Sequence, residues 1–249
     1  MLRLGAEKGH LRFQGTQFGF IAMVLGIVVA LWLGAAPASS QRMANWTLDE
    51  LLKQLDKEAK SFHALSANVE RTKVTVVVND RSTETGQILV RGDDKMLLEL
   101  NPPDGRIILR DGGKLYVYNP KAKQVDEYDL GKHRALVDQF LLLGFGSSGN
   151  DLKKGYLVTL QGEQMLDKKR VFLLDLTPKS DKVREQFSKI QLWIDEATWL
   201  PVRQKFLETG SGDYLEIHYT NIVRNPKIPD SRFKKIWPKD VTKVKPQGE

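Results

Sequence analysis

The stretch Lys189–Asn221 limits the possible folds of this chain more than any other segment. Ile190, Leu192 and Ile194 alternate with other side chains, which is the period of two that a half-buried strand requires. Glycine, serine and aspartate at 209–213 are typical of a tight turn between two further extended segments. The stretch therefore predicts a three-stranded antiparallel meander with one apolar and one wet face, and such a face must be covered.

Alternation within this meander also predicts which side chains share a face. Val202 and Phe206 are expected on one side of the second strand, and Arg203 and Lys205 on the other. In the third strand, the apolar side chains recur at every second position from Leu215 onward. These assignments predict the face that must be covered.

Short strands with turn residues between them are also expected before the meander. The expected segments are 65–78, 82–90, 96–100, 106–110, 114–118, 124–128, 156–160 and 171–177, with an edge strand within 241–246. Strands at this spacing predict an antiparallel sheet that is curled or closed. The sequence contains no repeat of fixed period and no linker, so we expect one domain over residues 39–249.

Two helices are expected beside the sheet. Thr47 and Glu50 form a capping box, and apolar residues follow at helical spacing. The second, Arg134–Leu143, is short and very apolar. It is either an ordinary packing helix or a movable lid, because glycines at Gly131 and from Gly144 onward could act as hinges.

The first 38 residues resemble a secretory signal peptide. Basic residues precede an apolar run at 18–33, and Ala36-Pro37-Ala38 offers a small-residue cleavage site. An uncleaved membrane anchor is the alternative, and both predict export. The chain has no cysteine, so the exported domain depends on its apolar core without disulfides and is not itself a lipoprotein.

Few residues indicate catalysis or metal binding. His63 and His133 lack partners at metal-ligand spacing, and His218 with Glu216 on the polar face of a strand is typical of a solvated pair. No nucleophile, phosphate-binding or dinucleotide motif occurs. The net charge of +7 is spread along the chain without a basic block, so we expect no nucleic-acid partner. These observations predict a protein that is not an enzyme and needs no cofactor.

The order of these segments resembles the LolA family of periplasmic lipoprotein carriers. The resemblance begins at Leu48 and continues to about Lys245. Its specific segments are 86–91, 106–118, 124–125, 190–195, Leu200-Pro201, Phe233 and Trp237-Pro238. They are residues of a fold pattern and not of a catalytic signature.

The resemblance implies a mainly β fold with some α-helix. This fold is an incomplete, strongly curved antiparallel β-barrel, a half-barrel whose open side is covered by helices around an apolar cavity. It also implies that Arg91 holds the lid closed, although Gly92 stands here where the family usually has proline. The candidate lid and cavity residues are Leu51, Leu55, Phe62, Arg91, Leu136, Phe140, Leu141 and Phe145.

We therefore expect a monomeric periplasmic carrier that binds lipoprotein acyl chains, or a related lipid. It would shuttle them from an inner-membrane ABC lipoprotein exporter to an outer-membrane acceptor. The alternative is a periplasmic lipoprotein or lipid sensor of the RseB type that regulates a signalling partner. A hydrolase and a structural β module with a filled core are further alternatives.

Overall fold

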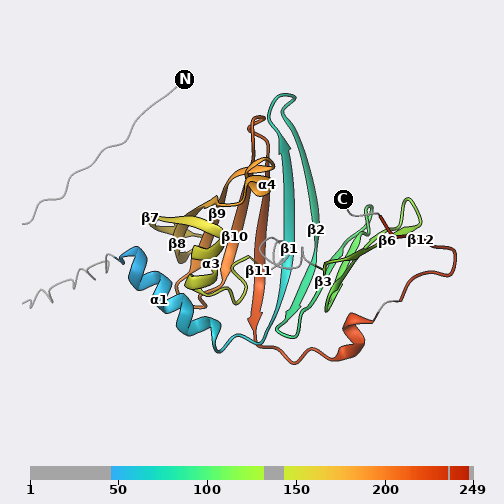
Figure 1. The fold of residues 1–249 in the computed structure, drawn as a ribbon, viewed down its shortest axis with the longest axis horizontal. Helices are drawn as coiled ribbons and strands as arrows, with labels where there is room; N and C mark the ends of the chain where they lie inside the picture. The colour runs from blue at the N-terminus through green and yellow to red at the C-terminus, as the bar shows by residue number, and fades with distance from the viewer. Residues whose placement is uncertain (1–45, 132–142, 235, 247–249) are drawn as a thin grey trace, which may run out of the picture. The chain divides into compact units, whose positions relative to one another are not determined.

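The computed structural model describes residues 46–131, 143–234 and 236–246. Within them, twelve strands form one sheet in the order β12-β6-β5-β4-β3-β2-β1-β11-β10-β9-β8-β7 (Figure 1). The strands are β1 Ala64–Thr75, β2 Asp80–Arg91, β3 Lys95–Leu100, β4 Ile107–Asp111, β5 Lys114–Asn119, β6 Gln124–Asp129, β7 Tyr156–Leu166, β8 Lys169–Pro178, β9 Phe187–Asp195, β10 Pro201–Glu208, β11 Tyr214–Arg224 and β12 Thr242–Val244. The sheet is curved and is not closed into a barrel, which confirms the expected fold class.

All neighbouring strands pair antiparallel except β12, which lies parallel to β6 at one edge. The expected meander is present, since β10 pairs with both β9 and β11. The long strands β1, β2 and β11 lie between β7–β10 on one side and β3–β6 on the other (Figure 1). The pairing of β1 with β11 therefore brings strands from early and late in the sequence together in the middle of the sheet.

The helices are α1 Leu48–Ala59, α3 Gly149–Gly155, α4 Asp181–Arg184 and the 3-10 helix η2 Asp230–Phe233. The capping box of α1 is confirmed, because Glu50 N–H donates to Thr47 Oγ1 and Thr47 N–H donates to Glu50. A second capping box at Ser148 and Asp151 begins α3. Each box satisfies backbone donors that the first turn of a helix leaves without partners.

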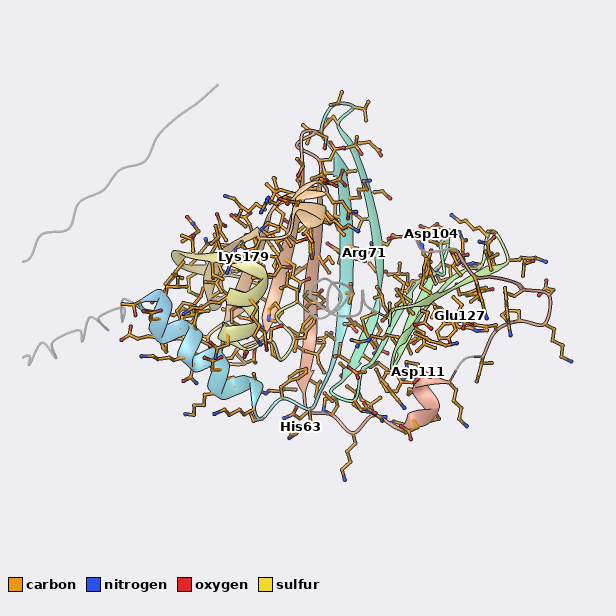
Figure 2. The ribbon with its side chains drawn as sticks, in the orientation of Figure 1. His63, Arg71, Asp104, Asp111, Glu127 and Lys179 are labelled. Atoms are coloured by element: carbon orange, nitrogen blue, oxygen red, sulfur yellow. The ribbon has the colours of Figure 1, made fainter. Side chains whose placement is uncertain are left out.

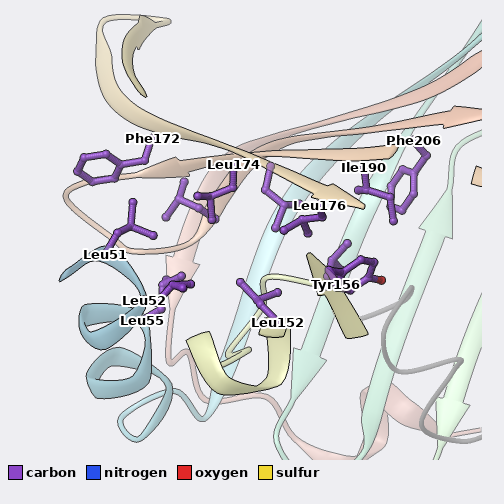
Figure 3. Packing of buried hydrophobic residues seen from close by; sticks show 13 residues of the cluster. Leu51, Leu52, Leu55, Leu152, Tyr156, Phe172, Leu174, Leu176, Ile190 and Phe206 are labelled. Carbon is purple, nitrogen blue, oxygen red and sulfur yellow. The ribbon is translucent and has the colours of Figure 1, made fainter. Parts of the chain in front are cut away.

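We call the sheet face that carries Ile88, Leu98, Phe206 and Ile217 the inner face. The two helices α1 and α3 pack on its β8–β10 part, where leucines of α1 meet apolar side chains of these strands (Figure 3). The main members of this cluster are Leu51, Leu52, Leu55, Leu152, Phe172, Leu174, Leu176, Ile190, Leu192 and Ile194. The helices thus bury the apolar face that the meander predicted.

The opposite, outer face is covered at β2–β6 by residues 228–234 and 236–241, which we call the C-terminal segment. Leu89, Leu97 and Leu109 pack there with Phe233 of η2, and Trp237 packs against this group. A strand side chain thus faces the C-terminal segment or the inner face according to its position in the alternation.

Three details of the sequence interpretation are wrong. Strand β1 ends at Thr75, and Val76 and Val78 lie exposed in the hairpin turn. The expected wet face of the meander carries buried Trp193, which packs with Val202. A register shift between positions 201 and 203 puts Val202 on that face, opposite to Phe206, because a bulge reverses the alternation locally.

Candidate functional site

An apolar cavity of about 250 Å³ lies on the inner face beside the helix-covered part of the sheet. Its lining residues are Arg71, Ile88, Met96, Leu98, Ile108, Phe187, Gln204, Phe206, Leu215, Ile217 and Tyr219. Strands β1–β4 supply one wall, and β9–β11 supply the other. Apart from three polar side chains, the site offers hydrocarbon and aromatic surface, which suits an apolar ligand.

A buried hydrogen-bond chain forms one part of the wall. The hydroxyl of Tyr219 donates to Gln204 Oε1 at 3.0 Å, and Gln204 Nε2 donates to the carbonyl of Leu143 at 2.6 Å. Gln204 is only 2% exposed, so these bonds replace water for a group that is costly to bury alone. These hydrogen bonds connect the cavity wall to Leu143, which belongs to the helix-covered core cluster.

The ring of Tyr219 also carries packing contacts. It meets Phe145 edge-on, with the ring centroids 4.9 Å apart. Burial raises the pKa of the Tyr219 hydroxyl well above its usual value, because the phenolate would lose its hydration. Tyr219 therefore acts here as a neutral hydrogen-bond donor.

An ion-pair group completes the wall at the β1–β2 side. The Nη1 atom of Arg71 lies 2.7 Å from Glu84, and Arg106 contacts the other oxygen of Glu84 at 2.9 Å. Burial lowers the pKa of the Arg71 guanidinium, and Glu84 partly offsets this effect. A carboxylate shared by two guanidinium groups therefore stands beside an apolar cavity.

Four of the predicted apolar site residues lie in the described core. Leu51 and Leu55 are buried between α1 and the sheet, and do not line the cavity. Phe145 is buried beside Tyr219, and Phe62 packs against the same cluster. Leu136, Phe140 and Leu141, with most of the expected helix 134–143, fall outside the described residues. The lid and cavity roles of all these residues stay predictions.

Arg91 lies on the outer face with the C-terminal segment. Its guanidinium donates to both oxygens of Asp93, to the carbonyl of Ile228 and to Asp230, and it stands 5.1 Å from the ring centre of Phe233. These hydrogen bonds hold the pKa of Asp93 and of Asp230 below their usual range. In the described residues Arg91 fastens the C-terminal segment, whereas its predicted lid contact involves residues that the structure does not describe.

Sequence reasoning missed Arg71 and Gln204. A signal for Arg71 was available, because it follows Leu65, Ala67 and Val69 at the next inward-facing position of the alternation. Gln204 lies two residues before Phe206 and therefore shares its inward-facing side, so the alternation offered a signal for Gln204 as well. A polar residue on an apolar stripe marks the wall of this site.

The described residues show no site for a metal ion, since no group of three or more His, Cys, Asp or Glu side chains could hold one. Within the same ranges, no helix has the length and apolar character needed to cross a membrane.

The fold and cavity together define a curved, open β-sheet protein with an apolar pocket on its inner face. A family model described as "Uncharacterized protein" matches residues 92–224. Curated relatives include proteins named outer-membrane lipoprotein carrier protein. The chain belongs to the LolA-like family.

One such carrier, from Dechloromonas aromatica, is 24% identical over 73% of this chain and 81% of its own length. An uncharacterized protein of Methanocaldococcus jannaschii is 22% identical over 76% of this chain, and the chain spans about half the length of that relative (51%). Among solved structures, an uncharacterized conserved protein from Thermus thermophilus superposes with a TM-score of 0.52 at 15% identity, covering 79% of this chain and 98% of the other. The last likeness shows the fold alone.

Proposed function

We propose that this protein is a periplasmic carrier that binds the acyl chains of lipoproteins, or of a related lipid, in the inner-face cavity. In this role it receives its cargo from an inner-membrane ABC lipoprotein exporter and delivers it to an outer-membrane acceptor. The proposal includes export through the N-terminal 38 residues and requires no catalysis. The carrier names of its relatives support it.

The observation that carries the proposal is the apolar cavity itself. Burying one methylene group contributes about 0.8 kcal/mol, so full burial of a sixteen-carbon chain offers roughly 13 kcal/mol without any hydrogen bond. The cavity of about 250 Å³ is slightly smaller than the ~300–1,000 Å³ of usual ligand sites. A whole acyl chain therefore requires the wall to move or part of the chain to stay outside.

Two adjacent isoleucines of β4 provide a matched test. Ile108 lines the inner-face cavity, while Ile107 lines a separate outer-face hollow of about 200 Å³ under the C-terminal segment. We expect Ile108→Trp to fill the cavity and weaken binding of a fluorescent acyl probe at least tenfold. Ile107→Trp, on the same strand, should leave binding unchanged.

Equal binding by wild type and both variants, all confirmed as folded by circular dichroism, would place the ligand elsewhere and refute the proposal. Native mass spectrometry of protein purified from its own envelope tests the cargo directly. A mass increase matching an acylated species supports the carrier. A stable complex with a signalling protein, formed or released on lipid binding, would instead favour the sensor function.

A further inference from the structure

Arg71 is a charged side chain on the apolar inner face. Its neighbours on β1 at the same face, Ala67 and Val69, are buried core residues. Arg71 pairs across the sheet with Ile217 and Glu84 and lines the cavity with Ile217. Its side chain is 19% exposed, so most of it is removed from bulk solvent.

Positive charge exceeds negative charge in the group around Arg71. Arg71 and Arg106 share Glu84, and Lys121 pairs with Asp104 beside them. Three cations thus stand against two carboxylates, leaving one positive charge without a compensating acid in this group. Figure 2 labels two members of this group, Arg71 on β1 and Asp104 in the turn before β4.

The hydrogen bonds of Arg71 leave donors for a ligand. A guanidinium has five N–H groups. Within the described residues, Arg71 gives one hydrogen bond, from Nη1 to Glu84. Because keeping a guanidinium in an apolar wall is costly unless its donors are satisfied, a bound anion would stabilise this arrangement.

We propose that Arg71, supported by Arg106, binds the anionic head of a single-chain amphiphile, a carboxylate or a phosphate, whose acyl chain occupies the cavity. This inference rests on the proposed acyl-binding function and specifies the chemistry of its ligand. A guanidinium and a carboxylate or phosphate form short charge-assisted hydrogen bonds, often in pairs. The apolar walls hold the chain, and Arg71 selects the head.

A competition assay tests head recognition with three ligands of equal chain length. Palmitate, hexadecyl phosphate and hexadecanol would each displace a neutral fluorescent acyl probe from the full protein. We expect both anions, or one of them, to bind at least about tenfold more tightly than the alcohol, which corresponds to ~1.4 kcal/mol. The anion that binds more tightly distinguishes a fatty acid from a phosphate-headed lipid.

Substitution of Arg71 should remove only the preference for the anion. Arg71→Met is expected to bind all three ligands as weakly as wild type binds the alcohol, and Arg71→Lys should keep part of the preference. Arg81→Met removes an exposed charge from β2 and serves as the control, with no change expected. Arg106→Gln should reduce the preference by a smaller factor, and it keeps the test available if Arg71→Met does not fold.

The outcomes separate this inference from the function on which it rests. If wild type binds the alcohol and the anions equally, or if Arg71→Met and Arg106→Gln both keep the full anion preference, head recognition by Arg71 is wrong while the acyl-binding cavity stands. If wild type binds neither the probe nor any of the three ligands, the proposed function fails as well.

Discussion

Replacing Gln204 with leucine tests whether the buried chain at the cavity wall acts as a unit. The substitution removes the amide that accepts from Tyr219 and donates to the carbonyl of Leu143. Leucine has a similar size but no polar group. Two buried partners, one hydroxyl and one carbonyl, then lack hydrogen bonds.

The structure gives the size of this effect. A buried polar group left without a partner costs about 1–3 kcal/mol, so Gln204→Leu should lower the free energy of unfolding by about 2–6 kcal/mol. Tyr219→Phe removes one donor and leaves one acceptor of Gln204 unpaired, at about 1–3 kcal/mol. In the double variant only the Leu143 carbonyl lacks a partner. The double variant should therefore be more stable than Gln204→Leu alone.

Urea unfolding followed by circular dichroism measures all four proteins of this cycle. A second destabilising substitution usually lowers the free energy of unfolding further. Here we expect the opposite, because adding Tyr219→Phe to Gln204→Leu should raise it. If the double variant is less stable than Gln204→Leu by the full cost of Tyr219→Phe, the two side chains do not act together. That result would mean water from the cavity satisfies the freed hydroxyl.

Three further predictions concern other parts of the fold. Arg91→Met should loosen the C-terminal segment, which hydrogen exchange would show as faster amide exchange at 228–233. The control Arg81→Met should leave this exchange unchanged, and equal exchange rates in the two variants would refute the fastening role of Arg91. Gly86→Ala should destabilise the protein by about 1–3 kcal/mol in thermal unfolding, because a Cβ there would lie 2.1 Å from a backbone carbonyl oxygen of β3. Gly113→Ala is the control and should be neutral, because a Cβ at Gly113 would have no atom beyond its adjacent residues within 4 Å. Burial raises the pKa of Tyr156 to about 12, above the ~10 of an unfolded chain, so stability should fall as pH rises from 10 to 12. Tyr156→Phe should reduce this alkaline loss in urea titrations, and an unchanged slope would contradict it.

Local patterns predicted much of the fold. The meander, the capping box of α1 and most strands depend on residues close in sequence, so their periodicity and turn chemistry were sufficient. The strand 65–78 was predicted too long, because Val76 and Val78 have strand propensity but the partner strand turns back at Asp80. Propensity does not show where pairing stops.

The candidate site was predicted only in part. Leu51, Leu55 and Phe145 were predicted as lid or cavity residues, and the structure places them in the buried core. Their pattern in the sequence does not distinguish a filled core from a cavity wall. Arg91 was singled out, yet its contacts on the outer face depend on the C-terminal segment, which lies more than a hundred residues away in the sequence. Distance along the chain, and not residue type, limited these predictions.

The sequence by itself determined the alternating strands, their turns and an apolar face that had to be covered, because the side-chain period of a strand is a local property of the backbone. Only the tertiary structure decided which residues meet across that face. Arg71, Gln204 and Tyr219 come from β1, β10 and β11, and they share one cavity because of the long-range register between these strands and a bulge in β10. One step of register would turn each of these side chains to the other face.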